Sequence, residues 1–498
     1  MNRNSFLRFV AVAALSMACA LSSHAPAAPF ADAEAPRHAD TLIRNARIVD
    51  VERAQVASGQ AIVIRGGDIV AVGADQELAA VWTATRTIDA GERYVVPGLW
   101  DMHVHFGGGP DLIEENEALF PLYIAHGVTT VRDASGDLPD QVLAWRKEIA
   151  DGRLLGPNLF TSGAKIEGLK PFWKGTLEVG TRAEVDAVLD RLQRQDQVDF
   201  IKITDSTLDP CLFLYAVSQA RLRGMQTSGH IPPALTVRQA IEAGLSSIEH
   251  LDYAFNAGVR DESTIAAEFA VGRITRAQAS ARLAGGFDRT EAMSAYRRMA
   301  ELKVAVTPTL NGSRIIAFLD RESHADDAYL AYIGPRLRRT YEWRVARAAS
   351  ASAEDIAARH AHFEEMAGVL PMLQAAGVSI MAGTDAGFLN SYNYPGQGLH
   401  DELELYVKLG LTPAEALVSA TRAGPAWLSK LGRFGAVAPG KAADLLLVER
   451  DPLQDIRALR EIHAVVLRGQ VHDRASLDAM LAGVRARVKT WNEEQGAK

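Results

Sequence analysis

The sequence is poor in cysteine, and this excludes a fold held together by disulfides. Only Cys19 and Cys211 occur in 498 residues, and Cys19 lies in a segment that we expect to be removed. The mature chain therefore cannot form a disulfide within itself, and its stability must come from a hydrophobic core, bound metal or assembly. We expect Cys211 to be a small buried or half-buried residue.

An excess of basic charge is also missing. Lys and Arg number 53 against 61 Asp and Glu, which gives a net charge of -8 at pH 7. Because phosphate binding needs clustered Lys and Arg, and no extended basic run occurs, the composition argues against a nucleic-acid partner. With 48% hydrophobic residues, the chain has an ordinary globular composition and ample length for one large domain and a small accessory one.

Long hydrophobic runs are absent beyond the N-terminus. There, two arginines accompany an apolar run over residues 9–21, and residues 25–27 (Ala-Pro-Ala) resemble a cleavage site, so residues 1–28 have the pattern of a secretory signal peptide. Cys19 raises the alternative of a lipid anchor, although the residues before it match a lipidation motif poorly. No other segment reaches about 18 uninterrupted apolar residues. We expect an exported protein, periplasmic or secreted, with no membrane span.

Strand-like patterns occupy both ends of the chain. Short apolar runs bounded by turn residues occur at residues 41–50, 61–73, 444–448 and 463–469. We expect the two end segments, 29–96 and 426–480, to meet as one small β-sandwich domain, with a C-terminal tail over residues 481–498.

The middle of the chain, residues 97–425, alternates strand and helix patterns, which predicts parallel β/α units. Strands are expected at residues 100–105, 128–133, 159–162, 200–203, 226–230, 247–250, 304–309 and 378–383. Eight such units make an α/β fold of the (β/α)8 TIM-barrel type, whose active site lies at the C-terminal ends of the strands. The connections after the sixth and seventh strands are far longer than ordinary loops. We expect them to form a lid or a substrate wall, partly helical at residues 288–302 and 352–375.

The strongest chemical signal is the pair His103 and His105 at the end of the first predicted strand. Residues two apart on a strand point the same way, so the two imidazoles can chelate one divalent ion. The alternative, two polar residues on a solvated face, is opposed by the apolar neighbours and by the glycines at 107–109.

Lys202 lies in an otherwise apolar strand, where a lone ammonium would be expensive to bury. Burial lowers the pKa of a lysine, and a neutral amine can capture carbon dioxide to give a carbamate that bridges two metals. An ion pair with a barrel carboxylate is the alternative, and the residues alone leave both open.

Three more polar residues end predicted strands: His230, His250 and Asp385. One such histidine is usually structural, and an Asp at this place can cap the following helix. Two histidines at successive strand ends, after the histidine pair and a buried lysine, favour ligands of a second metal. In a barrel that already holds four imidazoles, Asp385 is better interpreted as a metal ligand and proton acceptor.

These positions resemble, in order, the two-metal branch of the amidohydrolase superfamily, and within it the imidazolonepropionase-like and prolidase-like (Xaa-Pro, Xaa-Arg/Lys dipeptidase) members. The likeness extends over residues 40–475 and includes the motifs at residues 377–385, 400–403, 411–416 and 440–445. The ligand set that the resemblance implies is His103, His105 and Asp385 for one metal, His230 and His250 for the other, and carbamylated Lys202 as the bridge. Two such metals share a hydroxide that attacks the scissile carbonyl, and Asp385 takes its proton. Zinc suits these ligands, and manganese and cobalt also fit.

Two further residues are candidates for substrate binding. His400 follows the last strand and can contact the substrate, with a capping role as the alternative. Tyr253, three residues after His250, can reach the substrate carbonyl.

The function predicted first is hydrolysis of an amide (C–N) bond in a small molecule, a dipeptide or an N-acyl amino acid. The alternative is a lactone, a cyclic amide or an amide-bearing xenobiotic on the same centre. A deaminase is disfavoured because deaminase relatives generally use one metal and place a Glu shortly after the strand-five His, whereas His230 precedes Ile-Pro-Pro. A non-enzymatic binding protein on a decayed barrel would have lost metal ligands, and none of the expected metal ligands is missing from the sequence. Relatives often assemble, so a homo-oligomer is an open expectation.

Overall fold

A computed structural model describes residues 37–496 of the chain. The predicted signal peptide, its cleavage site and Cys19 lie outside the described residues.

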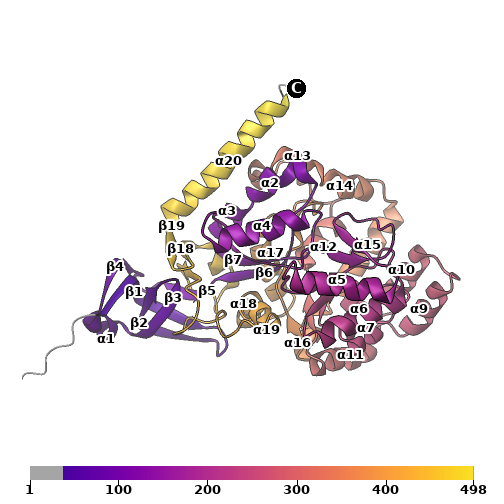
Figure 1. Ribbon diagram of the computed structural model, residues 1–498, viewed down its shortest axis with the longest axis horizontal. Coiled ribbons are helices and arrows are strands. Elements are labelled where there is room, and N and C mark those ends of the chain that lie inside the picture. Colours follow the sequence, from indigo (N-terminus) through magenta and orange to yellow (C-terminus); the bar gives the residue numbers. More distant parts are fainter. Residues whose placement is uncertain (1–36, 497–498) are drawn as a thin grey trace, which may run out of the picture. The chain divides into compact units, whose positions relative to one another are not determined.

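Segments from both ends of the chain form one sheet of eight strands (Figure 1). Its strands are β1 (Arg37–Asp50), β2 (Gln55–Arg65), β3 (Asp68–Ala74), β4 (Trp82–Asp89), β5 (Tyr94–Pro97), β17 (Leu445–Val448), β18 (Ile462–Leu467) and β19 (Gln470–Asp473). Strand β5 joins the two ends, because it runs parallel to β1 and antiparallel to β17, with Val95 opposite Leu447. The two ends therefore meet in a single sheet, while their arrangement as a sandwich stays a prediction.

The middle of the chain forms two parallel sheets, in the orders β10-β9-β11-β12-β13-β14-β15 and β16-β6-β7-β8. Their strands are β6 (Leu99–His105), β7 (Val128–Asp133), β8 (Asn158–Thr161), β9 (Lys165–Glu167), β10 (Thr176–Glu178), β11 (Ile201–Ile203), β12 (Thr227–Gly229), β13 (Ser247–Glu249), β14 (Ala305–Thr307), β15 (Ser379–Ile380) and β16 (Ala386–Gly387). Backbone hydrogen bonds join the two sheets: Met102 N donates to the Ala382 carbonyl at 2.8 Å, and Asp199 N donates to the Thr161 carbonyl at 2.9 Å.

Each of the eight strands predicted for the middle of the chain overlaps an observed strand. All six residues of β7 are buried, as is typical of parallel strands covered on both faces. Strands β9, β10 and β16 were not predicted, because β9 and β10 each have one apolar residue between two polar ones and β16 is only two residues long.

Helices follow the parallel strands along the chain: α2 (Ile113–Glu117), α3 (Phe120–Ala125), α4 (Pro139–Ala150), α5 (Arg182–Arg194), α6 (Pro210–Leu222), α7 (Val237–Ala243), α11 (Arg289–Glu301), α16 (Leu370–Ala375), α17 (Gln397–Lys408), α18 (Pro413–Thr421) and α19 (Ala423–Trp427). Their sequences specify both the start and the buried face. In α5 the Thr181 side chain accepts a hydrogen bond from Glu184 N, and Val185, Leu189 and Leu192 are buried at helical spacing.

The two long connections are helical. The one after β13 adds α8 (Leu251–Asn256), α9 (Glu262–Ala270) and α10 (Arg276–Ala284), and the one after β14 adds α12 (Leu310–Ala317), α13 (Pro335–Arg339), α14 (Glu342–Ala349) and α15 (Ala353–Ala367). The helix predicted at 352–375 is two helices, α15 and α16, which are separated at residues 368–369.

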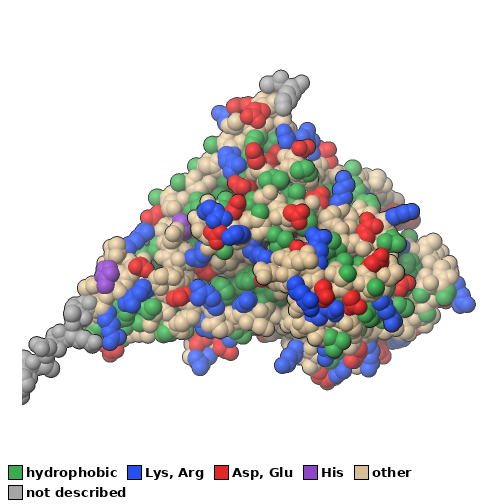
Figure 2. All heavy atoms as spheres, in the orientation of Figure 1, with side chains coloured by type: hydrophobic (Ala, Val, Ile, Leu, Met, Phe, Trp, Pro, Cys, Tyr) green, Lys and Arg blue, Asp and Glu red, His purple; other side chains and the backbone are tan. Residues whose placement is uncertain are grey.

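The surface mixes charges of both signs. On the face drawn in Figure 2, acidic and basic side chains are interspersed, with no broad area of one sign.

Cys211 is exposed, so its expected burial was wrong: it is the second residue of α6, on the side that faces solvent. Helix α1 (Asp75–Val81) packs beside β2 and β3, and α20 (Arg474–Gly496) packs on α3. None of the helices within residues 37–496 is long and apolar enough to cross a membrane.

Candidate active site

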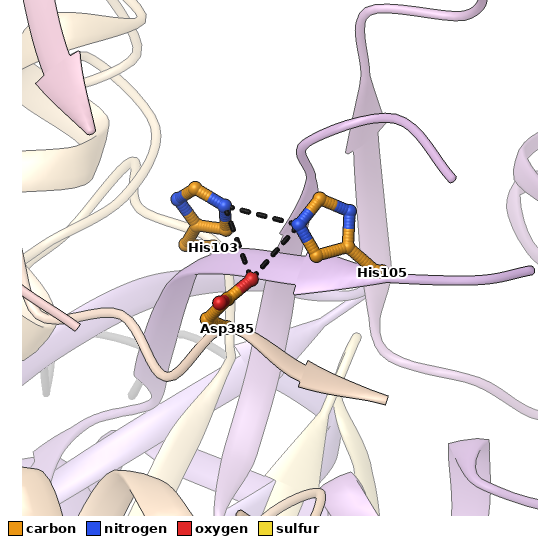
Figure 3. A group of neighbouring side chains, drawn as sticks. All are labelled: His103, His105 and Asp385. Carbon is orange, nitrogen blue, oxygen red and sulfur yellow. Dashed lines mark hydrogen bonds and ion pairs between the residues drawn. The ribbon is translucent and has the colours of Figure 1, made fainter. Parts of the chain in front are cut away.

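His103, His105 and Asp385 form one compact group (Figure 3). The two histidines come from β6, and Asp385 follows β15. His105 Nε2 lies 2.9 Å from Asp385 Oδ1, and His103 Nε2 lies 3.5 Å from the same oxygen. Gly383 permits this approach, because a side chain there would begin 2.9 Å from the backbone nitrogen of His103.

Lys202, His230 and His250 form a second group beside the first. His230 Nε2 lies 3.1 Å from His250 Nε2 and 3.4 Å from Lys202 Nζ. The His250 ring is 4.9 Å from the His103 ring, centroid to centroid, which links the two groups. The structure therefore brings together all six residues that the sequence predicted as metal ligands.

Hydrogen bonds to the Nδ1 atoms of His103 and His105 fix the orientation of the two imidazole rings. His103 Nδ1 lies 2.6 Å from Glu249 Oε2, and His105 Nδ1 lies 3.2 Å from the Ser135 carbonyl. Both oxygens only accept, so each Nδ1 donates a hydrogen to its partner, and each Nε2 faces the other ring and the Asp385 carboxylate. The two Nε2 atoms lie 3.2 Å apart, and both lie within 3.5 Å of Asp385 Oδ1, so three potential ligand atoms converge. The donor set therefore fits a divalent metal.

Burial favours the neutral form of three histidines of the cluster, His103, His230 and His250. It lowers the pKa of His103 to about 3, even though Glu249 acts in the opposite direction, and it lowers the pKa of His230 and of His250 as well. Neutral imidazoles are the form that binds metal. Burial also lowers the pKa of Lys202 to about 8, which makes its neutral amine accessible near neutral pH.

Glu249 and Arg132 belong to the site, and the sequence reasoning missed both. Glu249 accepts hydrogen bonds from the hydroxyls of Ser228 and Ser247, each at 2.6 Å, and from Arg132 Nη2 at 2.7 Å. Burial opposes ionisation of Glu249, but Arg132 and His103 hold its pKa well below the ordinary value. A carboxylate inside a buried strand is costly without partners, and that was the signal available in the sequence.

The two candidate substrate contacts differ in their placement. Tyr253 stacks on the His230 ring at 5.4 Å, and its hydroxyl lies 3.4 Å from Asp205 Oδ2. His400, by contrast, is buried away from the cluster, with Nε2 2.8 Å from the His126 carbonyl at the C-terminal end of α3. The structure does not bring His400 to the site, and its contact is the capping alternative.

Two cavities meet at the cluster. One, of about 640 Å³, is lined mainly by residues of the two long connections, and the other, of about 390 Å³, is lined by residues that include Phe172, Trp173 and Phe388. His250 and Asp385 line both cavities. The helical connections thus form walls of the larger cavity, as the sequence predicted.

The model of the amidohydrolase family matches residues 94–472. The chain belongs to the amidohydrolase family. It is 23% identical over 460 aligned residues to an ochratoxinase from Aspergillus niger, an alignment that covers 81% of this chain and 80% of that one.

Solved structures of other proteins share the fold. A Xaa-Pro dipeptidase with bound methionine superposes with a TM-score of 0.62 at 23% identity, covering 87% of this chain and 99% of that one. A bottromycin amidohydrolase superposes with a TM-score of 0.68 at 19% identity, covering 90% of each chain. This amidohydrolase therefore has an α/β fold that contains a TIM barrel, and it is a hydrolytic enzyme that acts on C–N bonds. Metal binding is typical of the family, and the group of His103, His105 and Asp385 is its candidate site.

Proposed function

We propose that this amidohydrolase cleaves the amide bond of dipeptides or N-acyl amino acids at a two-metal centre, in a barrel closed by the contacts between its two parallel sheets. The observation that carries the proposal is the junction of two cavities at a cluster of four histidines, one carboxylate and one buried lysine. The acyl half and the amine half of an amide substrate would each occupy one of the two cavities that meet at the cluster.

The residues that would hold the metals are His103, His105 and Asp385 for one ion, His230 and His250 for the other, and Lys202 between them. Two divalent ions, which we propose to be zinc, would polarise the scissile carbonyl and lower the pKa of the attacking water. Within this chain, Asp385 is placed to take the proton of that water and to return it to the leaving nitrogen. Asn390 Nδ2 donates to Asp385 Oδ1 at 3.0 Å, which fixes the orientation of the carboxylate.

Lys202 is proposed to act as a carbamate. Its side chain is 1% exposed, and among residues 37–496 it forms no ion pair with a carboxylate. The ion-pair alternative thus lacks a direct contact in this part of the chain, although the charges of Glu249 and Asp385 act on Lys202, and Nζ lies within 3.4 Å of a histidine of the cluster. A carbamate at this position would supply the negatively charged oxygens that two neighbouring cations require.

The test is amine release from a panel of dipeptides and N-acyl amino acids, measured on protein of known metal content with and without a chelator. We expect chelator-sensitive release from a subset of the panel. If no member releases an amine while two metals per chain remain bound, the amide proposal is wrong and lactones and cyclic amides should be assayed instead.

A further inference from the structure

Three arginines of the second long connection lack acidic partners. Arg344 and Arg347 on α14 and Arg359 on α15 all line the larger cavity. None of the three forms an ion pair with a carboxylate within residues 37–496. In the part of the chain that the structure describes, the Nε atom of Arg344 is buried without a hydrogen-bond partner, and the Arg359 side chain bonds only to the Ala317 carbonyl, at 3.3 Å.

The acidic residues of the same cavity, in contrast, already have partners. Asp205 pairs with Arg276 at 3.2 Å, and Asp252 pairs with His362 at 2.9 Å. Glu262 accepts a hydrogen bond from Val237 N at 2.8 Å. The unmatched charge of this cavity is therefore positive, and a buried donor without an acceptor is costly until a ligand supplies one.

The three arginines line the same cavity as His250 and Asp385 of the cluster. All three also line a small cavity of about 340 Å³, so they are grouped in one part of the structure. Arg344 in addition lines the cavity that contains Lys202 and His230, which places it at the junction where the scissile bond would lie.

We propose that Arg344, Arg347 and Arg359 bind the free carboxylate on the amino-acid half of the amide substrate. This rests on the proposed function and specifies it: the substrate class is amides whose amine half is an amino acid with an uncapped carboxylate. A guanidinium presents a planar fork of donors that matches a carboxylate, and the pairing strengthens where water is excluded. The acyl half then occupies the cavity lined by Phe172, Trp173 and Phe388, whose aromatic walls suit an apolar group.

The test uses matched substrates: N-benzoyl derivatives of phenylalanine, leucine and lysine, each as the free acid and as the carboxamide. We expect kcat/KM of the metal-loaded enzyme to be at least tenfold higher on the acids. The double variant Arg344→Gln/Arg347→Gln should lower the acid-to-carboxamide ratio of kcat/KM by about 10- to 100-fold, because each arginine donates a charged hydrogen bond. Arg273→Gln, an exposed arginine of the other connection that lines none of the three cavities, should keep the wild-type ratio.

The outcomes separate the two proposals. If wild type cleaves acids and carboxamides alike and the double variant leaves the ratio unchanged, the carboxylate site is wrong while amide hydrolysis stands. If wild type with both metals cleaves neither, the proposed function is wrong and the carboxylate site falls with it. Should the double variant unfold, Arg347→Gln alone gives the same readout, since Arg347 is exposed and its loss disturbs little packing.

Discussion

Glu249 Oε2 accepts hydrogen bonds from both His103 Nδ1 and Arg132 Nη2, at 2.6 Å and 2.7 Å. One buried carboxylate thus orients a proposed metal ligand and neutralises a buried guanidinium. Mutation of the hydrogen-bond partner of a metal-binding histidine typically lowers metal affinity 10- to 100-fold. Glu249 should therefore affect metal affinity without binding the metal itself.

Glu249→Gln should therefore weaken metal binding about 10- to 100-fold and lower the stability by about 3–5 kcal/mol, because Arg132 keeps its charge and loses its counterion. Metal content after dialysis against graded zinc buffers and denaturant unfolding would measure the two effects. Ser228→Ala is the matched control, since it removes one hydrogen bond to the same carboxylate and should cost only about 1 kcal/mol. Equal effects of the two variants would contradict the role given to the charge.

Lys202→Ala should abolish amide hydrolysis and lower the bound metal to less than two ions per chain. A short carboxylic acid such as acetate should restore part of both, because it can occupy the place of the proposed carbamate. Lys165→Met is the control: Lys165 is a buried lysine of the same cavity, but its Nζ donates to the Gly136 and Lys174 carbonyls. Any loss in that variant should not respond to the acid. Full activity of Lys202→Ala would remove the bridge from the mechanism.

Metal removal should destabilise the protein as well as inactivate it. Metal that binds the converging ligand atoms of the folded chain, and not the unfolded chain, stabilises the fold by mass action. We expect chelation to lower the melting temperature by several degrees and zinc to restore both the melting temperature and the activity. A melting temperature that does not respond to chelation would argue against the metal site.

Glu262 should make stability depend on pH. Burial raises its pKa to about 7, with an opposing hydrogen bond from Val237 N. Because the folded-state pKa lies above the ordinary value of 4.5, this contribution is fully present below about pH 4.5 and is lost as the pH rises through about 7. Relative to wild type, Glu262→Gln should therefore gain about 3 kcal/mol in free energy of unfolding between pH 4.5 and pH 8.5. A difference that is constant with pH would show that Glu262 titrates normally.

Much of the site could be predicted because its residues follow local rules. Strand alternation places His103 and His105 on one face, and parallel strands bring their C-terminal residues together wherever the partners lie in sequence. His400 shows the limit of this reasoning: its place on α17 is local, but whether that face turns to the cluster or to the end of α3 depends on helix packing. The same holds for Glu249, whose partners Arg132 and His103 come from two other strands.

Strand β5 has a consequence for how the molecule is assembled. Its one edge is completed by β1, close by in sequence, and its other edge by β17, where Val95 lies opposite Leu447. Contacts so distant in sequence form late in folding, because the loop between them must be closed first. During synthesis, that edge of β5 therefore remains without a partner until nearly the whole chain has emerged, and a chain cut short before β17 would expose it to other molecules.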